Sequence, residues 1–184
     1  MGEPKALLPW DDRPMLRYTV DQLLASPLER VAVVLGHRSD ELRAHLPADQ
    51  RLTVVENPDY RSGKVSSIVA GVAALPDPGH VLVLGVDQPR PAALLTGAVQ
   101  AHLRHGQSIT VAAFGGRRGH PVLFGPALRP DLLAIEEATQ GLRAVLLRYA
   151  DDVSLHETGS PLTLANLNTP AEYEAARALL RESR

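Results

Sequence analysis

The sequence predicts an α/β fold in which helices cover both faces of a mostly parallel β-sheet. The chain has 184 residues, the length of one ordinary domain with a core of its own. Its composition, 45% hydrophobic and 22% charged, is that of a globular protein. Short apolar runs alternate with segments of helical periodicity, and this alternation favours a sheet covered by helices. Because no internal repeat and no low-complexity segment occurs, we expect a single domain over residues 1–184.

Strands are expected where a short apolar run meets a turn-forming residue. The run Val31–Leu35, for example, is stopped by Gly36 and suits a strand that is buried on both faces. The expected strands are Val31–Leu35, Leu52–Val55, Val81–Leu84, Ile109–Ala113, Pro121–Phe124 and Val153–Glu157.

Helices are expected where apolar residues recur every three to four positions. The segment Met15–Leu24 has apolar residues at positions 15, 16, 20, 23 and 24, and proline marks the expected ends of other helices at Pro47 and Pro91. The expected helices are Met15–Leu24, Asp40–Leu46, Ser66–Leu75, Pro91–His105, Arg129–Ile135, Gly141–Tyr149 and Pro170–Glu182.

Charge and composition argue against several classes of protein. The net charge is −2 and the pI about 6.4, so we expect no nucleic-acid partner. The chain has no cysteine, which excludes a disulfide framework and thiolate metal sites. No apolar stretch approaches the length of a membrane span, and the first residues do not read as a signal peptide. We therefore expect a cytoplasmic protein without a membrane partner.

The first candidate site is Asp87-Gln88-Pro89, which follows the expected strand Val81–Leu84. In open α/β sheets, ligands bind beyond the carboxyl ends of the strands. A carboxylate at such an end is well placed to hold a hard cation such as Mg²⁺. The alternative is that Asp87 only starts a turn before Pro89.

Two glycine-containing segments are further candidates. Gly63, Ser66 and Ser67 lie at a helix start, where backbone N–H groups and hydroxyls can bind a phosphate or a base. The alternative is plain capping of the helix by a serine. Gly119 and His120 combine close backbone approach with a side chain that can donate to an anion. Their alternative is a tight turn between strands with an incidental histidine.

Two single residues complete the candidates. Asn168 precedes a helix that starts at Pro170, and an asparagine in this position is by default a helix cap. Lys5 lies near the start of the chain, where a lysine is normally a surface residue.

Taken in order, these segments resemble the molybdenum cofactor nucleotidyltransferases, within the wider family that includes sugar-nucleotide pyrophosphorylases. The family carries Met-Gly-x-Pro-Lys, Gly-x-x-Ser-Ser, Asp-Gln-Pro, Gly-His-Pro and Asn-Thr-Pro. The matching segments are residues 1–5, 63–67, 87–89, 119–121 and 168–170, spread over nearly the whole chain. The resemblance implies a Rossmann-like, three-layer nucleotidyltransferase fold of the GT-A-like type. It also implies a reaction in which a terminal phosphate attacks the α-phosphorus of a nucleoside triphosphate and pyrophosphate leaves.

The resemblance also implies roles for individual residues. Asp87 would hold Mg²⁺ with Asn168 as a second oxygen ligand, and Lys5 would face the triphosphate, so that Lys5 and Asp87 are the expected catalytic residues. The residues implied to bind the nucleotide or the second substrate are Gly63, Ser66, Ser67, Gln88, Pro89, Gly119, His120 and Arg143.

The chain departs from the family pattern in three places. Members have a strand and a Leu-Ala-Ala-Gly-x-Ser-x-Arg loop directly before Met-Gly-x-Pro-Lys, whereas this sequence begins at that Met. We expect the native protein to carry both, because loss of a central strand would leave two open edges in the sheet. Residues 138–143 lack the aspartate of the family's Gly-Asp-x-Gly-x-Arg, and Asn166 and Asn168 replace two acids, as in the guanylyl branch.

These observations predict an enzyme that transfers CMP, or else GMP, to molybdopterin. Asp-Gln-Pro and Gly-His-Pro favour the cytidylyl branch, whereas the asparagine pair favours the guanylyl branch. One alternative is a catalytically impaired module that binds the cofactor and delivers it to a molybdoenzyme. Another is a nucleotidyltransferase that acts on a sugar phosphate or another phosphorylated alcohol. An NAD-binding domain is disfavoured, since no Gly-x-Gly-x-x-Gly follows a strand.

Overall fold

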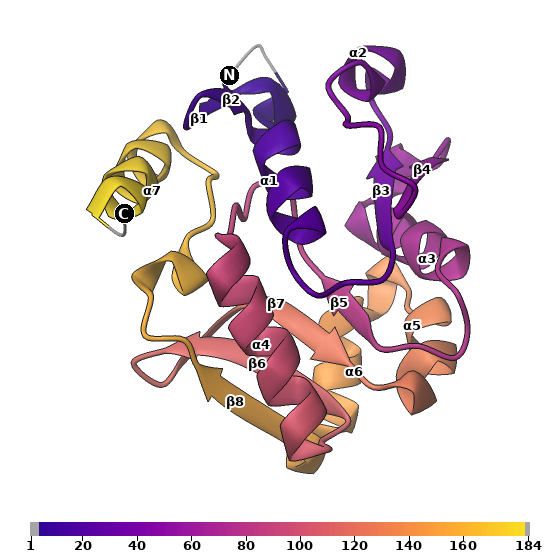
Figure 1. The fold of residues 1–184 in the computed structure, drawn as a ribbon. Helices are drawn as coiled ribbons and strands as arrows, with labels where there is room; N and C mark the ends of the chain where they lie inside the picture. Colours follow the sequence, from indigo (N-terminus) through magenta and orange to yellow (C-terminus); the bar gives the residue numbers. More distant parts are fainter. Residues whose placement is uncertain (1–3, 183–184) are drawn as a thin grey trace.

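The structure is a computed structural model that describes residues 4–182 (Figure 1). Met1, Gly2 and Glu3, which belong to the first family segment, lie outside the described residues. The helices are α1 Met15–Leu24, α2 Ser39–Arg43, α3 Lys64–Ala74, α4 Ala92–His105, α5 Arg129–Leu133, α6 Leu142–Arg148 and α7 Pro170–Glu182. The strands are β1 Pro9–Trp10, β2 Arg13–Pro14, β3 Val31–Leu35, β4 Leu52–Glu56, β5 Val81–Val83, β6 Ile109–Phe114, β7 Arg117–Phe124 and β8 Val153–Glu157.

Four strands form the larger sheet, in the order β5-β7-β6-β8. β6 pairs in parallel with β8, while β7 runs antiparallel to both β5 and β6. Three of the four strands therefore point the same way, and β7 is the reversed one. This confirms the predicted α/β fold with a mostly parallel sheet.

β3 and β4 form a separate parallel pair, in register from Val31 opposite Leu52 to Leu35 opposite Glu56. Helix α3 packs against both sheets. Gly71 of α3 faces β3 so closely that a Cβ atom there would lie 3.1 Å from Cγ2 of Val34. On the same helix, Val72 packs in one hydrophobic cluster with Val81 of β5. α3 thus bridges β3 and β5, which do not pair with each other.

Helices cover both faces of the four-stranded sheet (Figure 1). Val122 and Phe124 of β7 pack toward α5 and α6 in a cluster that includes Leu132 and Val145. The residue between them, Leu123, packs on the opposite face against α4. This alternation follows from the two-residue period of a strand, and it produces the three layers.

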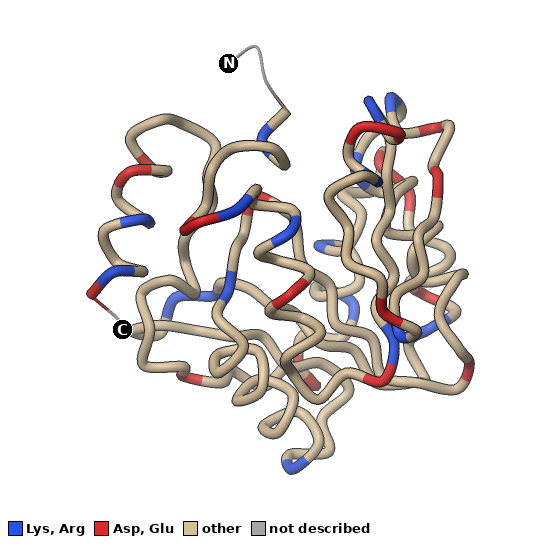
Figure 2. Tube along the Cα trace, turned by 45° about the horizontal axis from the view of Figure 1, so that its top comes forward, with Lys and Arg blue, Asp and Glu red and all other residues tan. Residues whose placement is uncertain are grey.

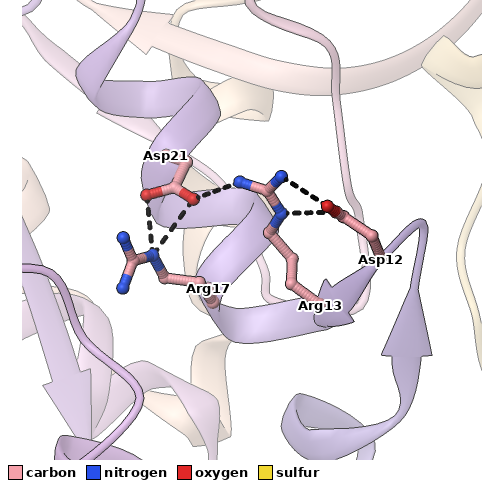
Figure 3. Close-up of polar contacts among 4 residues, drawn as sticks. All are labelled: Asp12, Arg13, Arg17 and Asp21. Atoms are coloured by element: carbon pink, nitrogen blue, oxygen red, sulfur yellow. Dashed lines mark hydrogen bonds and ion pairs between the residues drawn. The ribbon is translucent and has the colours of Figure 1, made fainter.

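A polar network fixes the short β1–β2 hairpin on α1 (Figure 3). Arg13 donates from Nη1 to Oδ2 of Asp21 at 2.8 Å, and Arg17 donates from Nε to Oδ1 of the same carboxylate at 2.9 Å. Arg13 also donates from Nε to Asp12 at 2.7 Å. These hydrogen bonds to two carboxylates raise the pKa of the Arg13 guanidinium. These bonds hold the hairpin against α1. The 3-10 turn η1, Lys5–Leu7, directly precedes the hairpin and carries Lys5.

Several predicted boundaries differ from those of the structure. β7 begins at Arg117 rather than Pro121, because the hairpin with β6 continues to the turn at positions 115 and 116. The tight turn between the two strands is therefore present at Gly115 and Gly116, but Gly119 and His120 lie in the strand that follows it. β5 ends at Val83, and α2 ends at Arg43 rather than Leu46.

The charged residues are mixed in sign over the molecule: Figure 2 shows Lys and Arg interspersed with Asp and Glu along the trace. Within residues 4–182, no helix is both long and apolar enough to cross a lipid bilayer.

The stability of the fold should depend on pH because His102 is a buried histidine with a lowered pKa. His102 is 2% exposed, and its ring contacts Oγ1 of Thr110 and Nδ1 of His80 at 2.8 and 2.9 Å. Burial, with a smaller contribution from His80, lowers the pKa of His102 to about 4. Between pH 6.5 and 4 the unfolded chain therefore binds a proton here that the native chain does not, so acidification favours unfolding.

From pH 7.5 to pH 5, this histidine should lower the free energy of unfolding by about 2 kcal/mol. Urea titrations of the wild type and of His102→Gln at both pH values measure the effect. The variant is expected to be less stable at pH 7.5 but to lose less stability on acidification. Equal losses in the two proteins would show that His102 titrates normally.

Candidate active site

Asp87 lies in a turn after β5, and hydrogen bonds between Gly85 and Gln88 close this turn. Gly85 donates its N–H to Oε1 of Gln88 at 2.9 Å, and Gln88 donates its N–H to the carbonyl of Gly85 at 3.0 Å. The carbonyl of Asp87 accepts the N–H of Leu167 at 2.9 Å. Asp87 is thus fixed both to the strand and to the segment that leads into α7.

Three side chains that are far apart in the sequence meet at this turn. Lys5 donates from Nζ to Oδ1 of Asn168 at 2.8 Å, and the same nitrogen lies 3.7 Å from Oδ2 of Asp87. The side chains of Lys5 and Asp87 are 34% and 32% exposed, so a ligand from solvent can reach them. The structure therefore brings Lys5, Asp87 and Asn168 together at the carboxyl end of β5.

Asn168 is not the cap of α7. Thr169 and Glu172 cap this helix reciprocally: Glu172 donates its N–H to Oγ1 of Thr169 at 3.2 Å, and Oε2 of Glu172 accepts the N–H of Thr169 at 2.8 Å. The side-chain oxygen of Asn168 instead accepts from Lys5. The interpretation of Asn168 as a helix cap is wrong, and that of Lys5 as an unengaged surface lysine is wrong as well.

Gln88 links the same two loops through its side chain. Its Nε2 donates to Oδ1 of Asn166 at 2.7 Å, while its Oε1 is already bound to Gly85. Both ends of the amide are thereby used. Gln88 orients the segment that carries Asn168, and the neighbouring Pro89 is buried.

The donor set suits a hard cation that is held jointly by protein and phosphates. Asp87 offers carboxylate oxygen and Asn168 amide oxygen, the ligand types that Mg²⁺ and Mn²⁺ take. In the described part of the chain, no group of three or more His, Cys, Asp or Glu residues could hold a metal ion. A cation at Asp87 and Asn168 would therefore take its other ligands from water or from substrate phosphates, as Mg²⁺ commonly does. The Lys5 ammonium already lies beside the oxygens of Asp87 and Asn168, so a positive charge at this position is favourable.

His120 of β7 lies near this cluster with one ring nitrogen unused. Within residues 4–182, its buried Nδ1 has no hydrogen-bond partner. Burial, reinforced by the positive charges of Arg90 and Lys64 and opposed by Asp87, lowers the pKa of His120 to about 4. At neutral pH the ring is therefore uncharged, and it can serve a ligand as a hydrogen-bond partner but not as a cation.

The segment before α3 is arranged by Asn57, which is 6% exposed. Its Nδ2 donates to Oγ of Ser66 at 2.9 Å and to Oγ of Ser67 at 3.0 Å. The hydroxyl of Ser66 in turn donates a hydrogen bond to the carbonyl of Gly63 at 2.9 Å. Of the two hydroxyls, that of Ser67 keeps a proton with no acceptor among the described residues. Serine capping of this helix is also wrong, because the N-cap residue is Gly63.

Glu137 occupies part of the α3 N-terminus. Its Oε2 accepts the N–H of Val65 at 3.1 Å. Gly63 has φ 123°, and a Cβ atom there would meet this carboxylate, so glycine is needed on both grounds. The expectation that the backbone N–H groups here are free is therefore wrong for Val65.

Arg143 stands apart from the cluster around Asp87. It is exposed in the first turn of α6, and within residues 4–182 no hydrogen bond or ion pair involves its side chain. The start of α6 does lie next to the start of α3, since a Cβ atom at Gly141 would lie 2.6 Å from Cγ2 of Val65. Arg143 is thus nearer to the Gly63–Ser67 segment than its sequence position suggests.

Asn57 begins the second candidate segment of the sequence but was given no role there, and Arg90 and Glu137 were not among the candidates. Asn57 and Glu137 act on Ser66, Ser67 and Val65 through contacts between distant segments. Arg90 directly follows Asp-Gln-Pro and is fully buried, but an arginine beside a site carries no sequence signal of burial.

Residues 1–153 match the model of the MobA-like NTP transferase domain. The chain is 33% identical to the nicotine blue oxidoreductase of Paenarthrobacter nicotinovorans over 152 residues, 78% of this chain and 72% of the relative. It is 25% identical to the molybdenum cofactor cytidylyltransferase of Escherichia coli over 96% of this chain and 88% of the relative. It is also 30% identical to the 2-C-methyl-D-erythritol 4-phosphate cytidylyltransferase of Nocardia farcinica over 98% of this chain and 88% of the relative.

Solved structures agree with this likeness. A nucleotidyl transferase from Methanothermobacter thermautotroptrophicus superposes with a TM-score of 0.80 at 25% identity, covering 97% of this chain and 86% of that one. The Rv0371C protein of Mycobacterium tuberculosis in complex with manganese gives a TM-score of 0.77 at 20% identity, covering 96% and 93% of the two chains. Since the family match spans most of the sequence and the fold agrees, the chain belongs to the MobA-like NTP transferase family, whose members use nucleoside triphosphates.

Proposed function

We propose that this protein transfers a nucleotide, preferentially CMP, from a nucleoside triphosphate to molybdopterin and releases pyrophosphate. The observation that carries the proposal is the meeting of Lys5, Asp87 and Asn168 at the carboxyl end of β5. The family is one of nucleotidyltransferases, and a molybdenum cofactor cytidylyltransferase is among the relatives that align over nearly the whole chain. Two cytidylyltransferases among these relatives favour CTP over GTP.

Asp87 and Asn168 would hold Mg²⁺ between them, and the manganese complex of a structural neighbour supports the use of a divalent cation. A cation held there would supply positive charge to the triphosphate. Lys5 moves its ammonium from Asn168 to the phosphates, where it adds a second positive charge. A phosphate oxygen of molybdopterin then forms a bond to the α-phosphorus, the bond from this phosphorus to the bridging oxygen breaks, and pyrophosphate leaves with the electron pair.

The remaining residues would bind and orient the nucleotide. Ser67 has a hydroxyl proton to donate, and Asn57 holds its oxygen in place. The ring of His120 is uncharged at neutral pH, so it would meet the nucleotide as a hydrogen-bond partner and not as a cation. Gly63 and Gly119 permit close backbone approach, Gln88 and Pro89 form the turn that presents Asp87, and Ser66 supports the loop before α3. Arg143 is proposed to reach the nucleotide from the start of α6.

We also propose that a further strand, with a phosphate-binding loop, lies between β3 and β5. Its support is the arrangement of the two sheets. In the described part of the chain, β3 pairs with β4 alone and β5 with β7 alone, while α3 packs on both β3 and β5. Such a strand would join the six strands of the two sheets into one sheet, and we propose a cytoplasmic enzyme of this single domain.

Other acceptors and activities are separable by experiment. The relative from Nocardia farcinica favours a phosphorylated alcohol as an alternative acceptor. The relative from Paenarthrobacter nicotinovorans favours a second candidate function, an oxidoreductase. Pyrophosphate release from CTP or GTP with each acceptor, measured beside oxidation of a reduced nicotinamide nucleotide, distinguishes them. Molybdopterin binding without pyrophosphate release would instead favour a module that delivers the cofactor to a molybdoenzyme.

Replacement of Asp87 by Asn tests the metal role. The variant keeps the size of the side chain but loses the charge that would bind the cation. Pyrophosphate release from CTP with molybdopterin and Mg²⁺ should fall at least ~100-fold, the scale of electrostatic catalysis. The assay compares the variant with the wild-type protein. Near-normal turnover of Asp87→Asn beside an active wild-type protein would contradict the mechanism.

The two neighbouring serines give a second test. Because the Ser67 hydroxyl has a free proton and that of Ser66 does not, Ser67→Ala should raise the KM for CTP about tenfold, the effect of losing one hydrogen bond to a ligand. Ser66→Ala should lower the melting temperature and change KM less, since its hydroxyl is used by Asn57 and Gly63. The reverse order of KM values would mean that Ser67 does not contact the nucleotide.

A further inference from the structure

Arg90 is a fully buried arginine whose hydrogen bonds all go to backbone carbonyl groups. Its side chain is 0% exposed. The acceptors belong to Pro89, His120, Thr163 and Ala165. A buried charge is costly unless its donors are satisfied, so these carbonyls must converge on the guanidinium for the fold to accept it.

The carbonyls come from three segments that carry residues of the candidate site. Arg90 itself follows the turn of Asp87. Its Nε donates to the carbonyl of His120 in β7 at 3.1 Å. Its Nη2 donates to the carbonyls of Thr163 and Ala165 at 3.0 and 2.7 Å, in the segment that continues to Asn168. One planar group thus joins the loop after β5, the strand β7 and the segment before α7.

Gly119 provides independent support for this close approach. A Cβ atom at Gly119 would overlap the carbonyl oxygen of Thr163, the same oxygen that Arg90 binds. The absence of a side chain at this position therefore lets β7 and the Thr163 segment close around the guanidinium. Gly119 and Arg90 therefore both lie against the carbonyl oxygen of Thr163.

We infer that Arg90 is a positioning residue, which holds Asn168 and His120 in fixed register with Asp87 and so shapes the cation site. The main-chain bond from Leu167 to Asp87 ties the same two loops but leaves β7 out. Arg90 also places its positive charge near Asp87, whereas burial lowers its own pKa to about 10. The inference rests on the proposed function, because it concerns the geometry of the cation site proposed there.

Arg129 provides a matched control within the same chain. It is also buried, at 8% exposure, and it donates to the backbone carbonyls of Leu75 and Pro76 at 2.7 and 3.3 Å. Its contacts lie among α5 and the segment after α3, away from Asp87 and Asn168. Lysine in place of either arginine keeps the charge but cannot bind carbonyls in several directions within one plane. Both substitutions should therefore lower the melting temperature.

The test is the affinity for Mn²⁺ alone, titrated by electron paramagnetic resonance on folded protein, in Arg90→Lys, Arg129→Lys and Asp87→Asn. Arg90→Lys should weaken Mn²⁺ binding about tenfold, whereas Arg129→Lys should keep the wild-type affinity. Equal affinities in Arg90→Lys and Arg129→Lys, with weak binding in Asp87→Asn, would overturn the inference while the proposed metal role stands. Unchanged affinity in Asp87→Asn would overturn the metal role, and the inference with it.

If Arg90→Lys does not fold, Gly119→Ala tests the contact between Arg90 and the Thr163 carbonyl instead. It retains Arg90 but displaces the Thr163 carbonyl, and it should likewise weaken Mn²⁺ binding. Wild-type affinity in a folded Gly119→Ala protein would count against the inference.

Discussion

The candidate site depends on the placement of one ammonium group between two oxygens. Lys5 bridges Asn168 and Asp87, and in doing so it joins the beginning of the chain to the end of β5 and to the segment before α7. Like the cation proposed to bind there, the ammonium is attracted by the Asp87 carboxylate. The Lys5 ammonium therefore compensates the charge of Asp87, and in the proposed mechanism it moves to the phosphates when a triphosphate and its cation bind.

The surrounding contacts keep these oxygens in place. Gln88 binds Asn166, the Thr169–Glu172 pair caps α7 and leaves the Asn168 side chain free for Lys5, and Arg90 joins both loops to β7. Except for the bond between Gln88 and Asn166, each of them joins a side chain to a backbone group. The part of the site that is proposed to move is the side chain of Lys5, which is 34% exposed.

The sequence was sufficient for the elements and for the motifs at strand ends, because both depend on local patterns. The alternation of strands such as Val31–Leu35 and Val81–Leu84 with helices predicted the fold, and the family motifs predicted that Lys5, Asp87 and Asn168 belong together. The turn between β6 and β7 was also expected, but the start of β7 at Arg117 was not predictable, since the apolar strand pattern begins only at Pro121. Contacts such as Glu137 with Val65, or Arg90 with Thr163, join distant segments and leave no local pattern.

A crystal structure grown with Mn²⁺ and CTP, recorded at a wavelength that gives manganese an anomalous signal, tests the central claim most directly. The account predicts a peak about 2.1–2.3 Å from an oxygen of Asp87 and from Oδ1 of Asn168, with the Lys5 ammonium moved onto the phosphates. A manganese peak away from both residues, with Lys5 still bound to Asn168, would contradict it.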